Sequence, residues 1–375
     1  MQVVEFLVLT AELTTVNKWF AKVAPVILTR QLTLNNRTHH LDLPLFTRLG
    51  SLTIVDGGVG EVVSRLTTLT CLNIKWSAFS GSSCGSLTNL TSLNIAKYQG
   101  IFDRTLTKLV NLRTLSMKLN DTVTGVSVSK LTALEHLNLS NNYNIYGQHL
   151  RTLTNITTLV VHHYSNVNTA DLEALPKLTT LDAGHSEINI NRLQYLTSLT
   201  RLDISWHPHV MSDNISTLTN LTWLDVRKSW GIIDINMRRL QVLKTSTQGV
   251  ILVSDKCRVT HTSWPYWYCD ARTIKVRPSP ASWLHIPNVV NLTVCLPDVY
   301  VVNSVSTITR LVSLRTLKIS SDKGVGDRGV DEALMARLRD LKIGHRLKAF
   351  TYKGHPGATL DDTYGNPLPQ VKPKK

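Results

Sequence analysis

A segment of the form L-x-x-L-x-(I/L/V) recurs along this chain at intervals of 20 to 22 residues, and no other feature constrains the fold so tightly. The middle apolar residues of successive segments are Leu52, Leu72, Leu93, Leu115, Leu137, Leu159, Leu181, Leu202 and Leu224. Because side chains alternate along a strand, the fourth and sixth positions of each segment share one face. A single repeat cannot bury that face alone, so the cadence predicts stacked strands in a solenoid.

The most regular repeat reads Leu134-Glu-His-Leu137-Asn-Leu139-Ser-Asn-Asn142, and it resembles the leucine-rich-repeat consensus L-x-x-L-x-L-x-x-N. The resemblance implies an α/β solenoid, a leucine-rich-repeat horseshoe with a concave parallel β-sheet. The short repeat further implies extended segments or tight helical turns on the convex side. The consensus Asn at the ninth position, which satisfies buried backbone groups, is kept only at Asn120 and Asn142. We therefore expect irregular loops or bridging water at that position elsewhere.

Residues 1–34 lack the repeat and carry apolar residues at helical spacing, which predicts a short helical N-terminal cap. An alternative follows from Leu13-Thr-Thr-Val-Asn-Lys-Trp-Phe20 and Leu32-Thr-Leu34, which resemble the second half of an F-box, although the Trp follows the Lys directly. That resemblance implies docking to the adaptor protein of a ubiquitin ligase. We keep both interpretations, a helical cap and an F-box-like remnant.

The remaining chain divides by its cadence. Residues 35–250 hold the regular repeats, and residues 251–285 are rich in Trp and Pro and are expected to be irregular. Degenerate repeats fill 286–353, where Asp331–Arg339 has helical spacing. The Pro-, Gly- and Lys-rich residues 354–375 predict a disordered tail.

The net charge of +15 favours an acidic partner, but the charge can also be spread over a long solvated surface. Nucleic acid is not expected, because no Arg/Lys stripe is interleaved with Gly and aromatic residues. No export signal and no membrane span are expected, which favours an intracellular location, in the cytoplasm or nucleus. The five cysteines predict free thiols; a Cys257–Cys269 bridge is the alternative for a secreted chain. The N-x-[ST] sequons follow from the repeat itself.

Positions three, five, seven and eight of each repeat should face outward on the concave side, and they form columns that can be read from the sequence. His, Trp, Arg and Asp concentrate in the columns between positions 136 and 228, and Trp and Arg are the usual anchors of binding surfaces. The predicted recognition patch consists of His163, His185, Arg201, Trp206, Trp223, Arg227 and Lys228, with an acidic rail of Asp182, Asp203 and Asp225.

Catalysis is not expected, because the chain has no nucleophile elbow, phosphate-binding loop or zinc-protease motif. His163 and His185 could reach one ion, but a convincing metal site needs three ligands, so we predict no metal or other cofactor. The leading hypothesis is an intracellular, non-enzymatic module that binds a protein on its concave face. The alternatives are an F-box-like substrate receptor of a ubiquitin ligase and a cell-surface adhesion protein.

Overall fold

The computed structural model describes most of the repeat array and parts of the chain beyond it. The described residues are 31–34, 49–55, 60–75, 81–163, 166–229, 231, 234–246, 249–254, 256–262, 267–269, 273–277, 288–296, 311–321, 347 and 349–353. The chain divides into two compact units, which we describe separately. Unit 1 comprises Met1–Asp182 and Ser186–Asn189, and unit 2 comprises Ala183–His185 and Ile190–Lys375.

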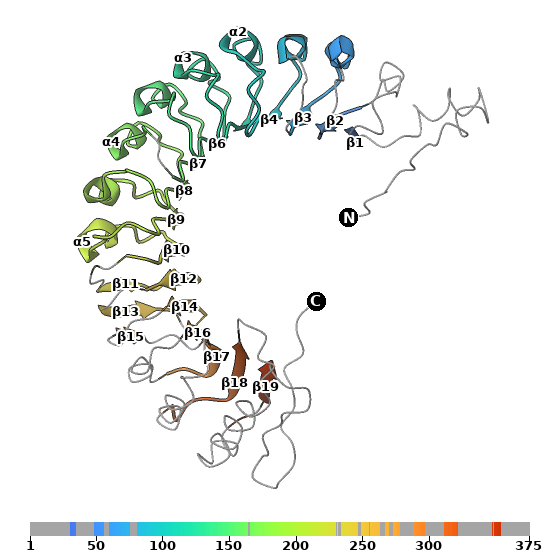
Figure 1. The fold of residues 1–375 in the computed structure, drawn as a ribbon. Helices are drawn as coiled ribbons and strands as arrows, with labels where there is room; N and C mark the ends of the chain where they lie inside the picture. The colour runs from blue at the N-terminus through green and yellow to red at the C-terminus, as the bar shows by residue number, and fades with distance from the viewer. Residues whose placement is uncertain are drawn as a thin grey trace, which may run out of the picture. The chain divides into compact units, whose positions relative to one another are not determined.

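Unit 1 is a stack of coils, each made of one short strand and a return path. The strands pair in parallel and in chain order. They are β1 (Gln31–Leu34), β2 (Ser51–Ile54), β3 (Cys71–Ile74), β4 (Ser92–Asn94), β5 (Thr114–Ser116), β6 (His136–Asn138), β7 (Thr158–Val160) and β8 (Thr180–Asp182). Tight helical turns cover the convex side, as the short repeat predicts (Figure 1). They are η2 (Gly60–Arg65), η3 (Gly81–Ser86), α2 (Asp103–Leu106), α3 (Gly125–Val128), η4 (Gly147–Leu150) and α4 (Thr169–Leu172).

Unit 2 begins with two coils of the same kind, which carry η5 (Ile190–Tyr195) and α5 (Ser212–Ile215). Its parallel sheet runs in the order β9 (Arg201–Asp203), β10 (Trp223–Val226), β12 (Val242–Thr245), β14 (Arg258–Thr262), β16 (Thr273–Arg277), β17 (Asn291–Leu296), β18 (Thr316–Ser321) and β19 (Ala349–Lys353). A second parallel sheet contains β11 (Ile235–Met237), β13 (Gly249–Val253) and β15 (Trp267–Cys269). This second sheet lies where the earlier coils have helical turns (Figure 1).

The aliphatic column that the repeat predicts forms the core of both units. Leu72 and Leu202 are completely buried and Leu137 is 1% exposed. Aligned leucines pair across neighbouring strands, as Leu72 does with Leu93 and Leu202 with Leu224. Burial of a side chain of this size stabilises the fold by about 1.5–3 kcal/mol. The expected parallel sheet is therefore confirmed, together with the alternation that directs the intervening side chains outward.

The coils shorten where the sequence cadence fades. The register aligns Leu243 with Val259 and Val259 with Ile274, so consecutive coils advance by 16 and 15 residues. Such coils are too short for a helical turn, and their return path is a strand of the second sheet. The expectation of an irregular stretch over residues 251–285 thus differs from the structure, which continues the main sheet there through β14 and β16. The buried Val259 and Ile274 keep the aliphatic column intact.

Polar side chains between coils form a second, regular set of contacts. The side-chain amides of Asn89, Asn111 and Asn155 each donate to a backbone carbonyl of the preceding coil, with N···O distances of 2.9, 2.9 and 3.0 Å. Asn220 does the same in unit 2, at 3.1 Å. Three of these four residues begin N-x-[ST] sequons, so the sequon Asn has a structural task in the repeat. Each such bond contributes about 1 kcal/mol.

The eighth position of the repeat has a left-handed backbone that the sequence did not reveal. Seven non-glycine residues there have φ between 54° and 69°: Lys97, Leu119, Asn141, His163, His185, Trp206 and Lys228. The conformation lets the amide of this residue donate to a carbonyl of the next coil, for example from Leu119 to Ser140 at 3.0 Å. Left-handed backbone costs about 1–2 kcal/mol for most residues and less for Asn.

Several predictions about the ends of the chain concern residues outside the described ranges. The cap or F-box-like remnant lies almost wholly in residues 1–30, and only Gln31–Leu34, which is β1, belongs to the described part. The Asp331–Arg339 helix and the 354–375 tail also lie outside it. Within the described ranges, no helix combines the length and the apolar character needed to cross a membrane.

Cys84 is buried, and burial raises the pKa of its thiol to about 12. Cys257 is a buried thiol rather than half of a disulfide, so the structure lacks a Cys257–Cys269 bridge.

We expect Leu119→Asn to raise the free energy of unfolding by about 1 kcal/mol, because Asn tolerates the left-handed backbone and the leucine side chain is only partly buried. Leu119→Val should lower it by a similar amount, because a β-branched residue is strained there. Chemical unfolding of the purified variants measures both changes. Val110→Asn is the control, since Val110 is an exposed residue outside the left-handed set. An equal gain at Val110 would refute the backbone explanation.

Candidate partner-binding surface

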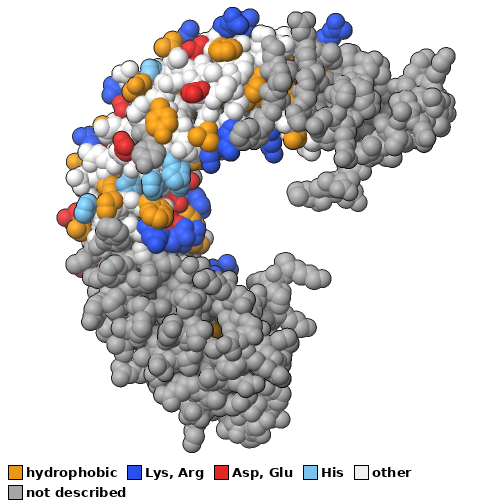
Figure 2. All heavy atoms as spheres, in the orientation of Figure 1, with side chains coloured by type: hydrophobic (Ala, Val, Ile, Leu, Met, Phe, Trp, Pro, Cys, Tyr) orange, Lys and Arg blue, Asp and Glu red, His pale blue; other side chains and the backbone are white. Residues whose placement is uncertain are grey.

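The sheet face of unit 2 is the surface formed by the outward positions of its main sheet. In β9, Arg201 is exposed, Leu202 is buried and Asp203 is partly buried, which shows the alternation that creates this face. Strand pairing places Arg201 beside Trp223 and Asp203 beside Asp225. Pairing with β12 then adds Lys244 next to Asp225. Lys and Arg side chains gather around a hydrophobic side chain over these strands (Figure 2).

Trp223 is held between cations from both neighbouring strands. The guanidinium carbon of Arg201 lies 3.5 Å from the centre of the Trp223 ring. From the other side of β10, the Lys244 ammonium lies 4.8 Å from the same ring. Cation–π contacts of this kind contribute about 0.5–1 kcal/mol at exposed sites. They fix the orientation of the Trp223 ring and of the Arg201 side chain before any partner arrives.

Trp206 projects from the left-handed position at the end of β9. The residue is 55% exposed and has a φ of 69°. The ring of His185 meets it edge-on at 5.7 Å, and the Lys228 ammonium lies 5.4 Å from its centre. Trp206, His185 and Lys228 occupy the same repeat position in successive coils, so their backbone geometry brings them together. Exposure alone does not distinguish Trp206, since Tyr143 and Tyr195 are similarly exposed; what distinguishes it is its contact with both His185 and Lys228.

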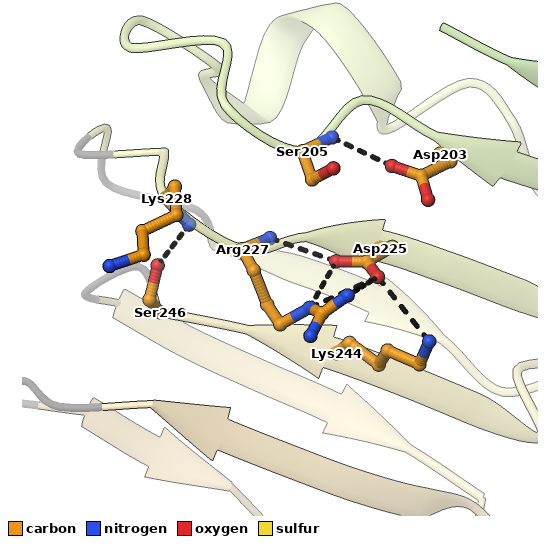
Figure 3. A network of polar contacts seen from close by, with 7 residues as sticks. All are labelled: Asp203, Ser205, Asp225, Arg227, Lys228, Lys244 and Ser246. Carbon is orange, nitrogen blue, oxygen red and sulfur yellow. Dashed lines mark hydrogen bonds and ion pairs between the residues drawn. The ribbon is translucent and has the colours of Figure 1, made fainter. Parts of the chain in front are cut away.

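Asp225 was predicted to face outward as part of an acidic rail, but its carboxylate is completely buried. Arg227 grips it with Nε and Nη2 at 2.9 and 2.7 Å, and the Lys244 ammonium lies 3.5 Å away (Figure 3). This hydrogen bonding, followed by the nearby negative charge, raises the pKa of Arg227. A buried carboxylate requires such compensation. Asp225 therefore positions Arg227 and Lys244 and is not available to a partner.

Asp203 is also partly occupied within its own coil. Its carboxylate accepts a hydrogen bond from the backbone N–H of Ser205 at 3.0 Å (Figure 3). In the next coil, the backbone N–H of Lys228 donates to Ser246 Oγ at 2.6 Å, which anchors the turn and leaves the ammonium group exposed. The acidic residues in this part of the face thus organise the backbone and the cations around them.

Of the ten residues of the predicted patch, eight lie in unit 2 and are described above. The other two, His163 and Asp182, belong to unit 1. His163 packs against the His162 ring with centroids 4.1 Å apart. The part of the chain that the structure describes contains no group of three or more His, Cys, Asp or Glu residues placed to hold a metal ion.

Sequence reasoning missed Lys244, which completes both the Trp223 and the Asp225 contacts. The repeat that contains Lys244 is degenerate, and only Leu240 and Leu243 still fit the pattern. Its outward positions were therefore not predicted. Reading the column onward from Leu243 would have placed Lys244 directly beside Asp225. His207 occupies the ninth position, where the consensus has Asn, and its Nε2 lies 2.9 Å from the carbonyl oxygen of Ala183.

The repeat, the parallel in-register strands and the buried aliphatic column define this protein as a leucine-rich-repeat solenoid. No family profile matches the sequence. A search of curated protein sequences likewise finds no match.

Solved structures similar to this chain include three leucine-rich-repeat proteins. A leucine-rich-repeat protein of Leptospira interrogans is 17% identical, with 87% of this chain and 96% of the other covered and a TM-score of 0.49. An internalin of Listeria monocytogenes is 19% identical, with 80% and 81% covered and a TM-score of 0.40. Toll, solved in the Toll–Spätzle complex of Drosophila, is 12% identical, with 86% and 50% covered and a TM-score of 0.49.

The buried His207 makes the stability of unit 2 depend on pH. Burial is the main cause that lowers the pKa of His207 from its usual 6.5, and the neighbouring His185 lowers it further. The neutral ring is therefore favoured in the folded state. Its contribution to stability is present above about pH 6.5 and is lost as the pH falls below that value. As the pH is lowered from about 7.5 to 5.5, the thermal unfolding midpoint of the parent chain should fall. We expect it to fall less steeply in His207→Asn.

Asn suits this test because it is the consensus residue at this repeat position, and in unit 1 the side-chain amide of Asn120 donates from the same position to the carbonyl of Tyr98. The exposed His209 provides the control, and His209→Asn should keep the parent pH dependence. Equal slopes for His207→Asn and the parent would show that the buried imidazole does not cause the effect.

Proposed function

We propose that this chain is a non-enzymatic protein-interaction module whose partner binds on the concave face of the repeat array. In unit 2 the contact surface centres on Trp206 and on Arg201 with Trp223, with His185, Lys228 and Arg227 around them. His163 and Asp182, which belong to unit 1, stay predictions. Asp203 and Asp225 support this surface through the groups they hold.

The exposed Trp206 in a left-handed backbone is the single observation that carries the proposal. A large side chain in this conformation costs free energy, by about 1–2 kcal/mol. The fold does not require Trp there, because Lys, Leu, Asn and His occupy the same position in other coils. The torsion itself recurs in seven coils and belongs to the fold, so the functional signal is the exposed Trp at this position, and Trp is among the residues most enriched in binding hot spots.

The surroundings of Trp206 also suit binding. Arg201 and Trp223 are two further residues of the types that dominate interface energies, and their 3.5 Å contact preorganises both. Less side-chain entropy is then lost when a partner binds. Arg227 is held by two bonds to Asp225 and is similarly fixed. This rigidity distinguishes the surface from an ordinary solvated array of long side chains.

We expect Trp206→Asn to abolish partner binding without lowering the melting temperature, because Asn relieves the backbone strain while the aromatic anchor is lost. A photo-crosslinking amino acid at position 242, an outward position of β12 beside Trp223, reports the partner in the organism's own cells, and mass spectrometry identifies it. Trp206→Asn should reduce the adduct at least about tenfold, as expected for loss of a hot-spot residue.

Tyr195→Asn is the matched control. Tyr195 is 60% exposed, and Arg192 lies 5.5 Å from its ring, but it belongs to η5 on the convex side. The adduct should be unchanged in this variant. An adduct that survives Trp206→Asn, or that is lost equally in both variants, would reject the proposed surface.

The F-box-like receptor and the cell-surface adhesion protein stay predictions, as does the intracellular location. The receptor hypothesis depends on residues 1–30, which lie outside the described part of the chain. A separate pull-down with the full chain tests it. Capture of the ubiquitin-ligase adaptor through the amino terminus would support the receptor hypothesis, and failure to capture it would reject that hypothesis.

A further inference from the structure

A column of lysines continues along the sheet face of unit 2 beyond the predicted patch. The register aligns Lys244 with Thr260, Thr260 with Lys275, Lys275 with Thr293, and Thr293 with Lys318. Every second strand therefore presents a lysine, with a threonine between. The buried neighbours Leu243, Ile274 and Leu317 show that these lysines lie on the outward face of the sheet. We call Lys244, Lys275 and Lys318 the lysine column.

The charge of this face is strongly unbalanced. Exposed Arg201, Lys228 and Arg258 flank the lysine column on neighbouring positions of the sheet. Among the described outward positions of unit 2, the acidic residues are Asp203 and Asp225, and Asp225 is already neutralised by Arg227 and Lys244. A surface with this excess of cations attracts an anionic partner.

The spacing of the lysine column restricts the shape of that partner. Neighbouring strands lie about 4.8 Å apart, so lysines on alternate strands are about 9.6 Å apart. A polyproline II segment has three residues per turn and rises about 3.1 Å per residue, which places every third side chain on one side at about 9.3 Å. An extended acidic segment with a carboxylate at every third residue therefore matches the lysine column.

The aromatic residues argue for carboxylates over nucleic-acid bases. Single-stranded nucleic acid is usually bound by bases stacked on free aromatic rings. The Trp223 ring instead carries Arg201 from one neighbouring strand and Lys244 from the other. The Trp206 ring is likewise contacted by Lys228. Stacked bases would have to displace these cations, whereas carboxylates can pair with them in place.

We propose that the sheet face of unit 2 binds an acidic, extended protein segment whose carboxylates, at every third residue, pair with Lys244, Lys275 and Lys318. This inference rests on the proposed function and names the chemistry of the partner. Lys244 is held in place by Asp225 and Trp223, and Lys275 and Lys318 extend the contact along the sheet.

Fluorescence anisotropy of the full chain with labelled peptides tests the proposal. One peptide repeats Glu-Pro-Pro, and its isomer has the same composition with all Glu residues clustered at one end. We expect the repeating peptide to bind at least about threefold more tightly, and added salt to weaken its binding. Lys275→Gln combined with Lys318→Gln should weaken it at least about tenfold, with an unchanged melting temperature. Equal binding of the two isomers would overturn the proposal, as would tight binding by the double variant.

The matched control is Arg104→Gln with Lys108→Gln, which removes the same charge from exposed positions in and just after α2 of unit 1. It should change the affinity less than about twofold, and an equal loss would show a response to net charge alone. Tighter binding of an oligothymidylate than of either peptide would identify nucleic acid as the occupant and reject the proposal. A protein crosslinked at position 242 without peptide binding would reject this inference and leave the proposed function standing.

Discussion

The stacking of one coil on the next is the interaction on which every other feature of this protein depends. Each coil gives its neighbour an aliphatic side chain to bury and a row of backbone groups to bond, and neither is satisfied within a single coil. The completely buried Leu72 and Leu202 and the amide of Asn155 show the apolar and polar halves of this contact. The outward positions of the strands are free to vary because their side chains do not supply the apolar burial and backbone hydrogen bonds between coils.

The sheet face of unit 2 shows how that freedom is used. Asp225 is a fully buried carboxylate on this face, and it organises Arg227 and Lys244 instead of meeting a partner. Lys244 in turn steadies Trp223, whose other neighbour is Arg201. Five side chains, from β9, from β10 and the residue just after it, and from β12, thus form one rigid cluster. Rigidity of this kind reduces the entropic cost of binding, which favours a surface that recognises over one that is merely solvated.

Much of the fold could be predicted from the sequence, because the spacing of leucines such as Leu137 reports directly which side chains are buried. The composition of the site could be predicted for the same reason: alternation places Arg201 and Trp223 outward. The burial of Asp225 could not, since it depends on Lys244 in a repeat whose cadence had faded. The shortened coils around Val259 were missed because a search at one period cannot see a change of period. The backbone of Trp206 leaves no mark in residue type.

The left-handed turn at the eighth position has a consequence for how such a surface changes. The same torsion recurs in seven successive coils, from Lys97 to Lys228, and tolerates residues as different as Leu119 and His185. Exchanging one of these side chains alters one point of the surface and leaves the repeated backbone unchanged. Side chains at this position can therefore be exchanged one at a time, which changes what the edge of the array recognises while the backbone that supports it stays the same.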